Sequence, residues 1–325
     1  PAALTSTPGF HTRAVAKDHS VYVAYDSEER GLSPTFTVFR KDGKRVAELA
    51  KVAEPLPFLP NVERTRVTAG DLGFDAVLVR PRNFVAGIRY PVIVHVYGGP
   101  QHKQVIASFR RYLKDQWLAD HGFIVVAIDG RGTPNRGRKW ERATRGDFVR
   151  IPLADQKAAL SALGARYPEL DLARAGIYGW SFGGTMAAAA VMMMPETFAA
   201  AVAGAPVTDW HDYDTYYTER YLGLPAEHPE AYRVSSPITY ADKLSRPLLL
   251  IHGTVDDNVL FLNSIELSDA LFRAGKAHQF LPLSGFTHMV PEPEVAYRLA
   301  AATIQFFEDH LGDPVATGAA IDIAD

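Results

Sequence analysis

The residues of this chain with the clearest capacity for chemistry surround a serine, in the motif Gly-Trp-Ser-Phe-Gly at residues 179–183. A short apolar run at 175–178 comes directly before the motif, and helix-forming residues at 185–194 come directly after it. A serine on a sharp strand-to-helix turn needs glycines two residues away on both sides, because the strand and helix backbones nearly touch there. The pattern predicts that Ser181 presents a nucleophilic hydroxyl above the edge of a sheet.

A serine nucleophile needs a base, and the base needs a carboxylate that orients it. Where a serine sits on such a turn in an α/β-hydrolase, the acid and then the histidine follow it along the chain, each on a loop after a strand. Asp256 follows the apolar run 247–252, and His288 follows the run 277–283. Both therefore lie at carboxyl ends of predicted strands, where open parallel sheets collect catalytic groups. The sequence predicts a triad of Ser181, Asp256 and His288 for covalent acyl transfer.

Only one of the eleven histidines has the position that this chemistry requires. His288 follows the last predicted strand, whereas His95 and His252 lie inside or at the end of apolar strands. We interpret His95 and His252 as structural, with His252 as the weaker rival for the role of base.

The elements that must position these residues alternate between strands and helices. Apolar runs at 91–96 and 122–128 are typical of central strands buried on both faces. Further strands are predicted at 62–67 and 74–79 (an antiparallel pair), 198–204, 247–252 and 277–283, and helices at 155–167, 185–194, 265–274 and 294–311. This alternation predicts an α/β-hydrolase fold with a mostly parallel central sheet.

The beginning of the chain has a different pattern. Short strands are expected at 20–25, 35–39 and 45–49, the last two joined by an Asp-Gly turn. Two or three strands alone are only marginally stable in water, so we interpret these strands as the end of an all-β unit. The predicted boundaries are 1–55 for this unit and a proline-rich connector, 56–312 for the catalytic domain, and 313–325 for a loose tail.

Composition restricts the function further. The formal net charge of −3 gives no electrostatic reason to expect nucleic acid or an anionic membrane as a partner. No apolar run reaches about 18 residues, so we expect no membrane span. The absence of cysteine excludes disulfides, thiolate catalysis and cysteine–zinc sites. The compartment stays open between the cytoplasm and a bacterial periplasm, of which we favour the periplasm.

Several short motifs along residues 57–311 agree with one another. They stand at residues 90–100, 129–132, 155–156, 179–181, 205–210, 217–223 and 252–259. Together they resemble the catalytic domain of the prolyl oligopeptidase family of serine peptidases, in its dipeptidyl peptidase branch. The resemblance implies that residues 1–55 contain the last blade of an N-terminal β-propeller, that the other blades are a partner of this chain, and that the protein forms a homodimer.

The resemblance also implies roles for individual residues. Tyr97 matches a tyrosine that forms the oxyanion hole together with the backbone N–H of Phe182, and two such donors stabilise charge that develops in the transition state. Asp256, and not Asp257, matches the catalytic acid, two residues before Asn258. Asn258 matches an asparagine that binds a substrate carbonyl. The matched wall of an apolar pocket for proline or alanine consists of Val207, Trp210, Tyr213, Tyr217 and Val259.

The implied activity is release of X-Pro or X-Ala dipeptides from free amino termini of peptides, without a metal or organic cofactor. Two features depart from the family: Phe182 replaces the usual tyrosine, and Glu28-Glu29 are not at the position of the glutamates that hold the substrate's ammonium. We expect Glu28 and Glu29 to be solvated. The alternatives are an acylaminoacyl or oligopeptide-cleaving relative, a small-molecule esterase of the same fold, and an inactive interaction module.

Overall fold

The computed structural model describes residues 5, 7–52 and 54–312, so the predicted tail at 313–325 lies outside the described residues. Its main sheet has eight strands in the order β12-β11-β10-β9-β7-β8-β6-β5. Their bounds are β5 Val62–Ala69, β6 Leu72–Val79, β7 Tyr90–His95, β8 Ile124–Asp129, β9 Leu170–Trp180, β10 Ala200–Gly204, β11 Leu248–Gly253 and β12 Gln279–Leu283. β6 pairs antiparallel with β5 and β8, and the other neighbours are parallel. The predicted mostly parallel sheet is confirmed.

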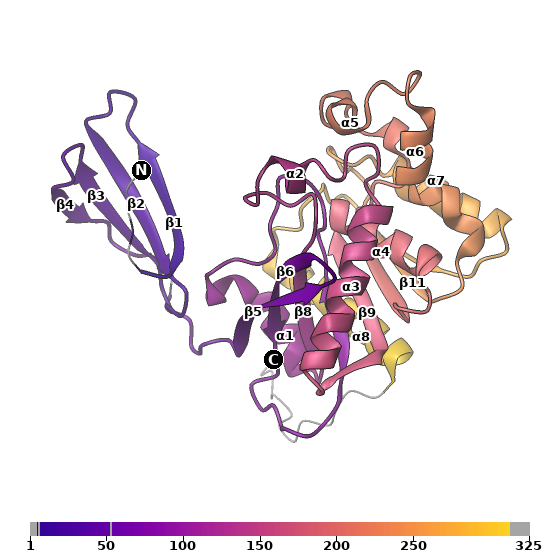
Figure 1. Ribbon diagram of the computed structural model, residues 1–325, viewed down its shortest axis with the longest axis horizontal. Helices are drawn as coiled ribbons and strands as arrows, with labels where there is room; N and C mark the ends of the chain where they lie inside the picture. Colours follow the sequence, from indigo (N-terminus) through magenta and orange to yellow (C-terminus); the bar gives the residue numbers. More distant parts are fainter. Residues whose placement is uncertain (1–4, 6, 53, 313–325) are drawn as a thin grey trace.

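Helices cover both faces of this sheet, which explains why its central strands are apolar throughout (Figure 1). Successive side chains of a strand point to opposite faces. Val92 and Val94 of β7 accordingly pack in the core beneath α3 (Arg150–Arg166) and α4 (Phe182–Met193). Ile93 packs on the other side, in the core that contains residues of α1 (Leu113–Asp120) and α8 (Pro293–Leu311).

Helix α3 begins five residues before its predicted start at Asp155, which is a correction to the sequence analysis. The Asp147 carboxylate accepts the backbone N–H groups of Val149 and Arg150 at 3.2 and 2.8 Å. It thus satisfies donors that a helix start leaves free. The remaining helical segments are α2 Arg138–Glu141, α5 Thr215–Leu222, α6 Pro229–Ser235, α7 Leu262–Arg273, and the 3₁₀ turns η1 Phe109–Tyr112, η2 Trp210–Asp212 and η3 Pro237–Lys243. None of the described helices combines the length and the hydrophobicity that a membrane-spanning helix requires.

The N-terminal residues form a separate four-stranded antiparallel sheet, which stands at the left in Figure 1 and joins the main body through a connector. Its strands are β1 Gly9–Val15, β2 Val21–Glu28, β3 Thr35–Arg40 and β4 Arg45–Glu48. The sequence analysis did not predict β1, because its polar residues Thr12 and Arg13 interrupt the apolar pattern.

Hydrogen bonds join the base of this sheet to the main body. The buried hydroxyls of Ser27 and Ser108 are 2.9 Å apart, and the Phe109 N–H donates to the Glu29 carbonyl at 2.8 Å. The Glu29 carboxylate also accepts from Arg64 Nε at 2.6 Å. The expectation that Glu29 is solvated was therefore wrong, whereas Glu28 is exposed.

Candidate active site

Ser181 lies on the predicted turn, between the end of β9 and the start of α4. Its backbone has φ 60° and ψ −122°, a conformation that a residue with a side chain rarely adopts. Two hydrogen bonds hold it there: the Ser181 N–H donates to the Gly204 carbonyl at 2.9 Å, and the Thr185 N–H donates to the Ser181 carbonyl at 3.0 Å. The turn raises the serine above the sheet edge in a fixed orientation.

The two glycines of the motif are required by close backbone contacts. A Cβ atom on Gly179 would lie 2.3 Å from the Gly183 carbonyl oxygen, and one on Gly183 would lie 2.2 Å from the Val96 carbonyl oxygen. No side chain fits at these distances. The strand and helix backbones therefore approach each other as the spacing of the motif predicts.

Asp256 and His288 form a close pair at the carboxyl ends of neighbouring strands β11 and β12. His288 Nδ1 is 2.7 Å from Asp256 Oδ2. The other carboxylate oxygen, Oδ1, accepts the backbone N–H groups of Asn258 and Val259, each at 2.9 Å. These donors fix the fully buried carboxylate with one oxygen directed at the imidazole.

The electrostatics of Asp256 suit a carboxylate that orients a base. Burial alone would raise the pKa of Asp256, but hydrogen bonds from His252, His288 and the Asn258 N–H outweigh burial and hold the pKa well below its usual range. An ionised Asp256 assigns the proton to Nδ1 of His288. The Nε2 atom is then left as the proton acceptor. Asp257, by contrast, is exposed and has no such partners among the described residues.

The loop that carries His288 is tied to the residue that precedes Ser181. Trp180 Nε1 donates to the His288 carbonyl at 2.9 Å. Gly253, at the end of β11, lets this loop pass, because a Cβ there would lie 2.4 Å from the Phe286 carbonyl oxygen. Within the described residues, no hydrogen bond joins the Ser181 hydroxyl to the His288 ring. Such contacts are often long before substrate binds.

His252 has a role that its position in the sequence did not reveal. It is fully buried, with Nδ1 2.7 Å from Ser264 Oγ and Nε2 2.8 Å from the Val259 carbonyl oxygen. A carbonyl can only accept, so Nε2 carries a proton, and it also lies 3.3 Å from Asp256 Oδ2. His252 is thus structural, as interpreted from the sequence, and it supports the carboxylate that faces His288.

A small cavity brings together most of the residues singled out from the sequence. Its lining consists of Tyr97, Ser181, Phe182, Val207, Trp210, Tyr213 and Tyr217. The rings of Trp210 and Tyr217 stack with centroids 6.3 Å apart, and Tyr213 meets Trp210 edge-on. Asn258 lies beside this group, since its Oδ1 accepts from the Tyr213 hydroxyl at 3.0 Å. Val259 is fully buried and lies outside the lining, where its backbone holds Asp256 and His252.

Tyr97 has the properties of a hydrogen-bond donor toward the serine. Burial, with a smaller contribution from Tyr213, raises the pKa of Tyr97 to about 12, so the phenol keeps its proton at neutral pH. Gly99, two residues after Tyr97, makes room for the ring of Phe182 in the cavity. A Cβ on Gly99 would lie 2.5 Å from the ring of Phe182. Tyr97 and Phe182 thus line the same cavity as Ser181.

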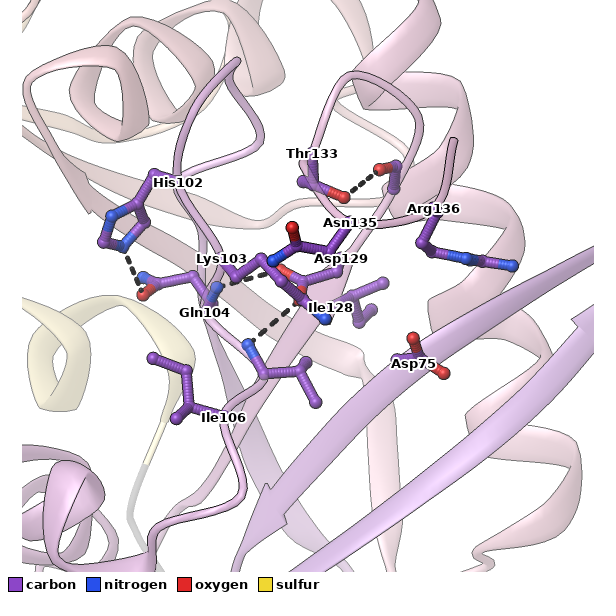
Figure 2. A network of polar contacts seen from close by, with 12 residues as sticks. Asp75, His102, Lys103, Gln104, Ile106, Ile128, Asp129, Thr133, Asn135 and Arg136 are labelled. Carbon is purple, nitrogen blue, oxygen red and sulfur yellow. Dashed lines mark hydrogen bonds and ion pairs between the residues drawn. The ribbon is translucent and has the colours of Figure 1, made fainter. Parts of the chain in front are cut away.

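Asp129 fixes the loop around Gln104, as Figure 2 shows. This loop follows β7 and also contains Tyr97. Its carboxylate, 1% exposed at the end of β8, accepts the N–H groups of Gln104 and Val105 at 2.9 and 3.1 Å. The Tyr112 hydroxyl bonds the same loop through the Gln104 carbonyl at 2.9 Å. The sequence analysis matched Asp129 only as part of a motif, whereas the structure gives it this anchoring role.

We expect Asp129 to make stability depend on pH. Burial outweighs the Gln104 and Val105 hydrogen bonds and raises the pKa of Asp129 to about 6. The folded protein then holds this proton more firmly than the unfolded chain, so stability falls as the pH rises from about 4 to 6. Urea unfolding across this pH range should show that the difference in unfolding free energy between wild type and Asp129→Asn changes by up to about 3 kcal/mol. A difference in unfolding free energy that does not vary with pH would contradict a raised pKa of Asp129.

The fold and this site define an α/β-hydrolase with a serine nucleophile elbow. The sequence profile of the prolyl oligopeptidase family matches residues 108–314. The chain belongs to this family.

Individual relatives agree with this membership. The chain is 38% identical over 277 residues to dipeptidyl peptidase 8 of Homo sapiens, covering 83% of this chain and 31% of that protein. The Mus musculus protein of the same name is 37% identical over the same length and coverage. The crystal structure of Porphyromonas gingivalis dipeptidyl peptidase 4 superposes with a TM-score of 0.84 at 30% identity, covering 93% of this chain and 44% of that one. The chain thus spans about a third of the curated relatives' length.

Proposed function

We propose that the protein is a serine peptidase that releases X-Pro and X-Ala dipeptides from the amino termini of peptides. The observation that carries the proposal is the small cavity, whose lining contains Ser181 and Tyr97 together with Val207 and aromatic side chains. The relatives named above as dipeptidyl peptidases support the same reaction class.

The proposed reaction proceeds through an acyl-enzyme. His288 Nε2 takes the proton of Ser181 as the serine oxygen attacks the peptide carbonyl, and Asp256 stabilises the resulting imidazolium. The Tyr97 hydroxyl and the Phe182 N–H bind the oxyanion. His288 then protonates the leaving amine, the C–N bond breaks, and the newly formed amine departs. His288 then takes a proton from water as the water oxygen attacks the ester carbonyl, the C–O bond to Ser181 breaks, and His288 returns the proton to the serine oxygen.

The lining of the cavity supports selection of a small apolar residue. Val207, Trp210 and Tyr217 present carbon surface, and burying each CH₂ group of a proline ring contributes about 0.8 kcal/mol. A lysine side chain would bury an ammonium in a lining without a carboxylate, which costs far more. Asn258, held by Tyr213, is proposed to donate its amide N–H to the substrate carbonyl that precedes the cleaved residue.

We propose that residues 1–55 are the last blade of a β-propeller and its connector. Both faces of the N-terminal sheet carry an aromatic pair. On one face Tyr22 stacks on Phe39 with ring centroids 5.2 Å apart. On the other face Tyr25 meets Phe36 edge-on with ring centroids 5.1 Å apart. Further blades would cover these faces and are proposed to supply the group that holds the substrate's ammonium. Residues 56–312 are then the catalytic domain, and a homodimer is the assembly that the family resemblance implies.

A substrate panel tests this function. We expect nitroanilides of free X-Pro and X-Ala to be cleaved, and their N-acetylated forms and X-Lys to be cleaved at least about tenfold more slowly. Faster cleavage of the acetylated forms would support an acylaminoacyl peptidase. Equal cleavage of lysine and proline substrates, or cleavage of simple esters alone, would contradict the proposal.

Tyr217→Ala tests the cavity itself. Removing this ring is expected to lower the preference for proline over lysine by about tenfold, because the ring forms part of the cavity wall. The neighbouring Tyr216 is 81% exposed, so Tyr216→Ala is the matched control and should retain the preference. The measurement is kcat/KM for both substrates, with phosphonate labelling of Ser181 as a check that the nucleophile is intact.

A further inference from the structure

A second cavity, of about 400 Å³, lies beside the one that contains Ser181. Four arginines contribute to its lining: Arg138, Arg142, Arg145 and Arg220. Glu141 is the single acidic residue there, and its Oε1 accepts the Asn135 N–H at 2.9 Å. Helix α2 and the loop after it supply three of the arginines, and α5 supplies the fourth (Figure 1).

The four arginines lack carboxylate partners among the described residues. In the part of the chain that the structure describes, none of the four lies within ion-pair distance of an acidic side chain, whereas Arg131 nearby pairs with Asp155 at 2.7 Å. Like charges around one cavity repel each other unless an anion joins them. A guanidinium offers paired N–H donors that match the two oxygens of a carboxylate.

The segment that carries these arginines is held in place by other contacts. The Gly146 N–H donates to the Tyr221 carbonyl at 3.1 Å, and the Gly132 N–H donates to the Trp140 carbonyl at 3.0 Å. Arg136 stacks on the Trp140 ring, 3.8 Å from its centroid. The four arginines are themselves exposed, so they can meet a ligand from solvent.

The second cavity adjoins the catalytic one through shared elements. Gln101 lines it and follows Tyr97 by four residues, and Gln101 Nε2 donates to the Tyr221 hydroxyl at 2.9 Å. The Tyr221 ring lies 5.1 Å from that of Tyr217, which lines the catalytic cavity. An extended peptide advances about 3.3 to 3.6 Å per residue, so two residues of a peptide span more than the 5.1 Å between these two rings.

We propose that this cavity binds a carboxylate of the peptide substrate, and that the protein thereby favours peptides with an acidic residue near the cleaved bond. The inference rests on the proposed peptidase function. The arginines contribute electrostatic attraction and bidentate hydrogen bonds, which weaken as salt screens the exposed charges.

The test compares peptides that differ by one charge. Glu is compared with Gln at each position flanking the X-Pro bond, with kcat/KM as the readout. We expect a preference for Glu of about five- to thirtyfold at one position in wild type at low salt. The double variant Arg142→Gln/Arg145→Gln should reduce this preference for Glu to below about twofold, while kcat/KM for the Gln peptide changes little. The matched control is Arg298→Gln on α8, an exposed arginine outside this cavity, which should retain the preference.

Charge reversal distinguishes direct binding of the substrate from a structural role of the arginine. Arg145→Glu is expected to lower turnover of the Glu peptide and to raise that of a Lys peptide at the same position. A preference for Glu that is absent in wild type, or unchanged in the double variant, would overturn the proposal. Calorimetry on the Ser181→Ala variant tests the cavity separately from catalysis: the Glu peptide should bind more tightly than the Gln peptide, and equal affinities would overturn the proposal. Failure to cleave the Gln peptide would instead count against the peptidase function.

Discussion

Ser181→Ala is expected to lower kcat for X-Pro substrates by on the order of 10⁵- to 10⁶-fold while KM changes little. In the proposed mechanism the hydroxyl oxygen forms the acyl-enzyme, and the other groups of the triad cannot replace it, because they act on the proton of that hydroxyl. The oxyanion donors would still bind the substrate carbonyl, so residual catalysis above the rate in water is expected.

The measurement combines turnover with labelling by an organophosphonate. Wild type should be labelled once, on Ser181, and the alanine variant should not be labelled. Ser161→Ala is the matched control, because Ser161 is exposed on α3 and should leave both turnover and labelling unchanged. Retention of turnover by Ser181→Ala would exclude the serine mechanism proposed here.

Asp256→Asn is expected to lower kcat by about 10⁴-fold, whereas Asp257→Asn should retain most activity. An asparagine amide at position 256 can donate to Nδ1 of His288, which moves the ring proton to Nε2 and removes the base that faces Ser181. Asp256 is buried against His288 at 2.7 Å, while Asp257 is exposed. The adjacent aspartates thus provide a matched pair.

Stability must be measured beside activity, because Asp256 also accepts the Asn258 and Val259 N–H groups. The pKa of Asp256 is lowered in the folded state, so its stabilising contribution is present above the unfolded pKa and is lost as the pH falls toward the folded one. The free energies of unfolding of wild type and Asp256→Asn should therefore converge at acidic pH. If Asp257→Asn caused the larger loss of activity, the assignment of the catalytic acid would be wrong.

Local sequence patterns were sufficient to predict the framework of this protein. The glycines at 179 and 183 predicted the tight turn at Ser181, because only residues without a Cβ allow the strand and helix to approach so closely. Continuous apolar runs predicted central strands, because a strand covered by helices on both faces has no polar side. The order of Ser181, Asp256 and His288 along those strands then placed all three at one edge of the sheet.

The tertiary structure alone decided which groups support that framework. His252 reaches Asp256, Asp129 anchors the loop around Gln104, and the arginines of α2 and α5 surround one cavity. Glu29 pairs with Arg64 across the connector, contrary to the sequence analysis. Each contact joins elements distant in sequence or depends on how a loop folds back. Local propensity and periodicity describe neighbours along the chain, so contacts that depend on packing between elements became visible only in three dimensions.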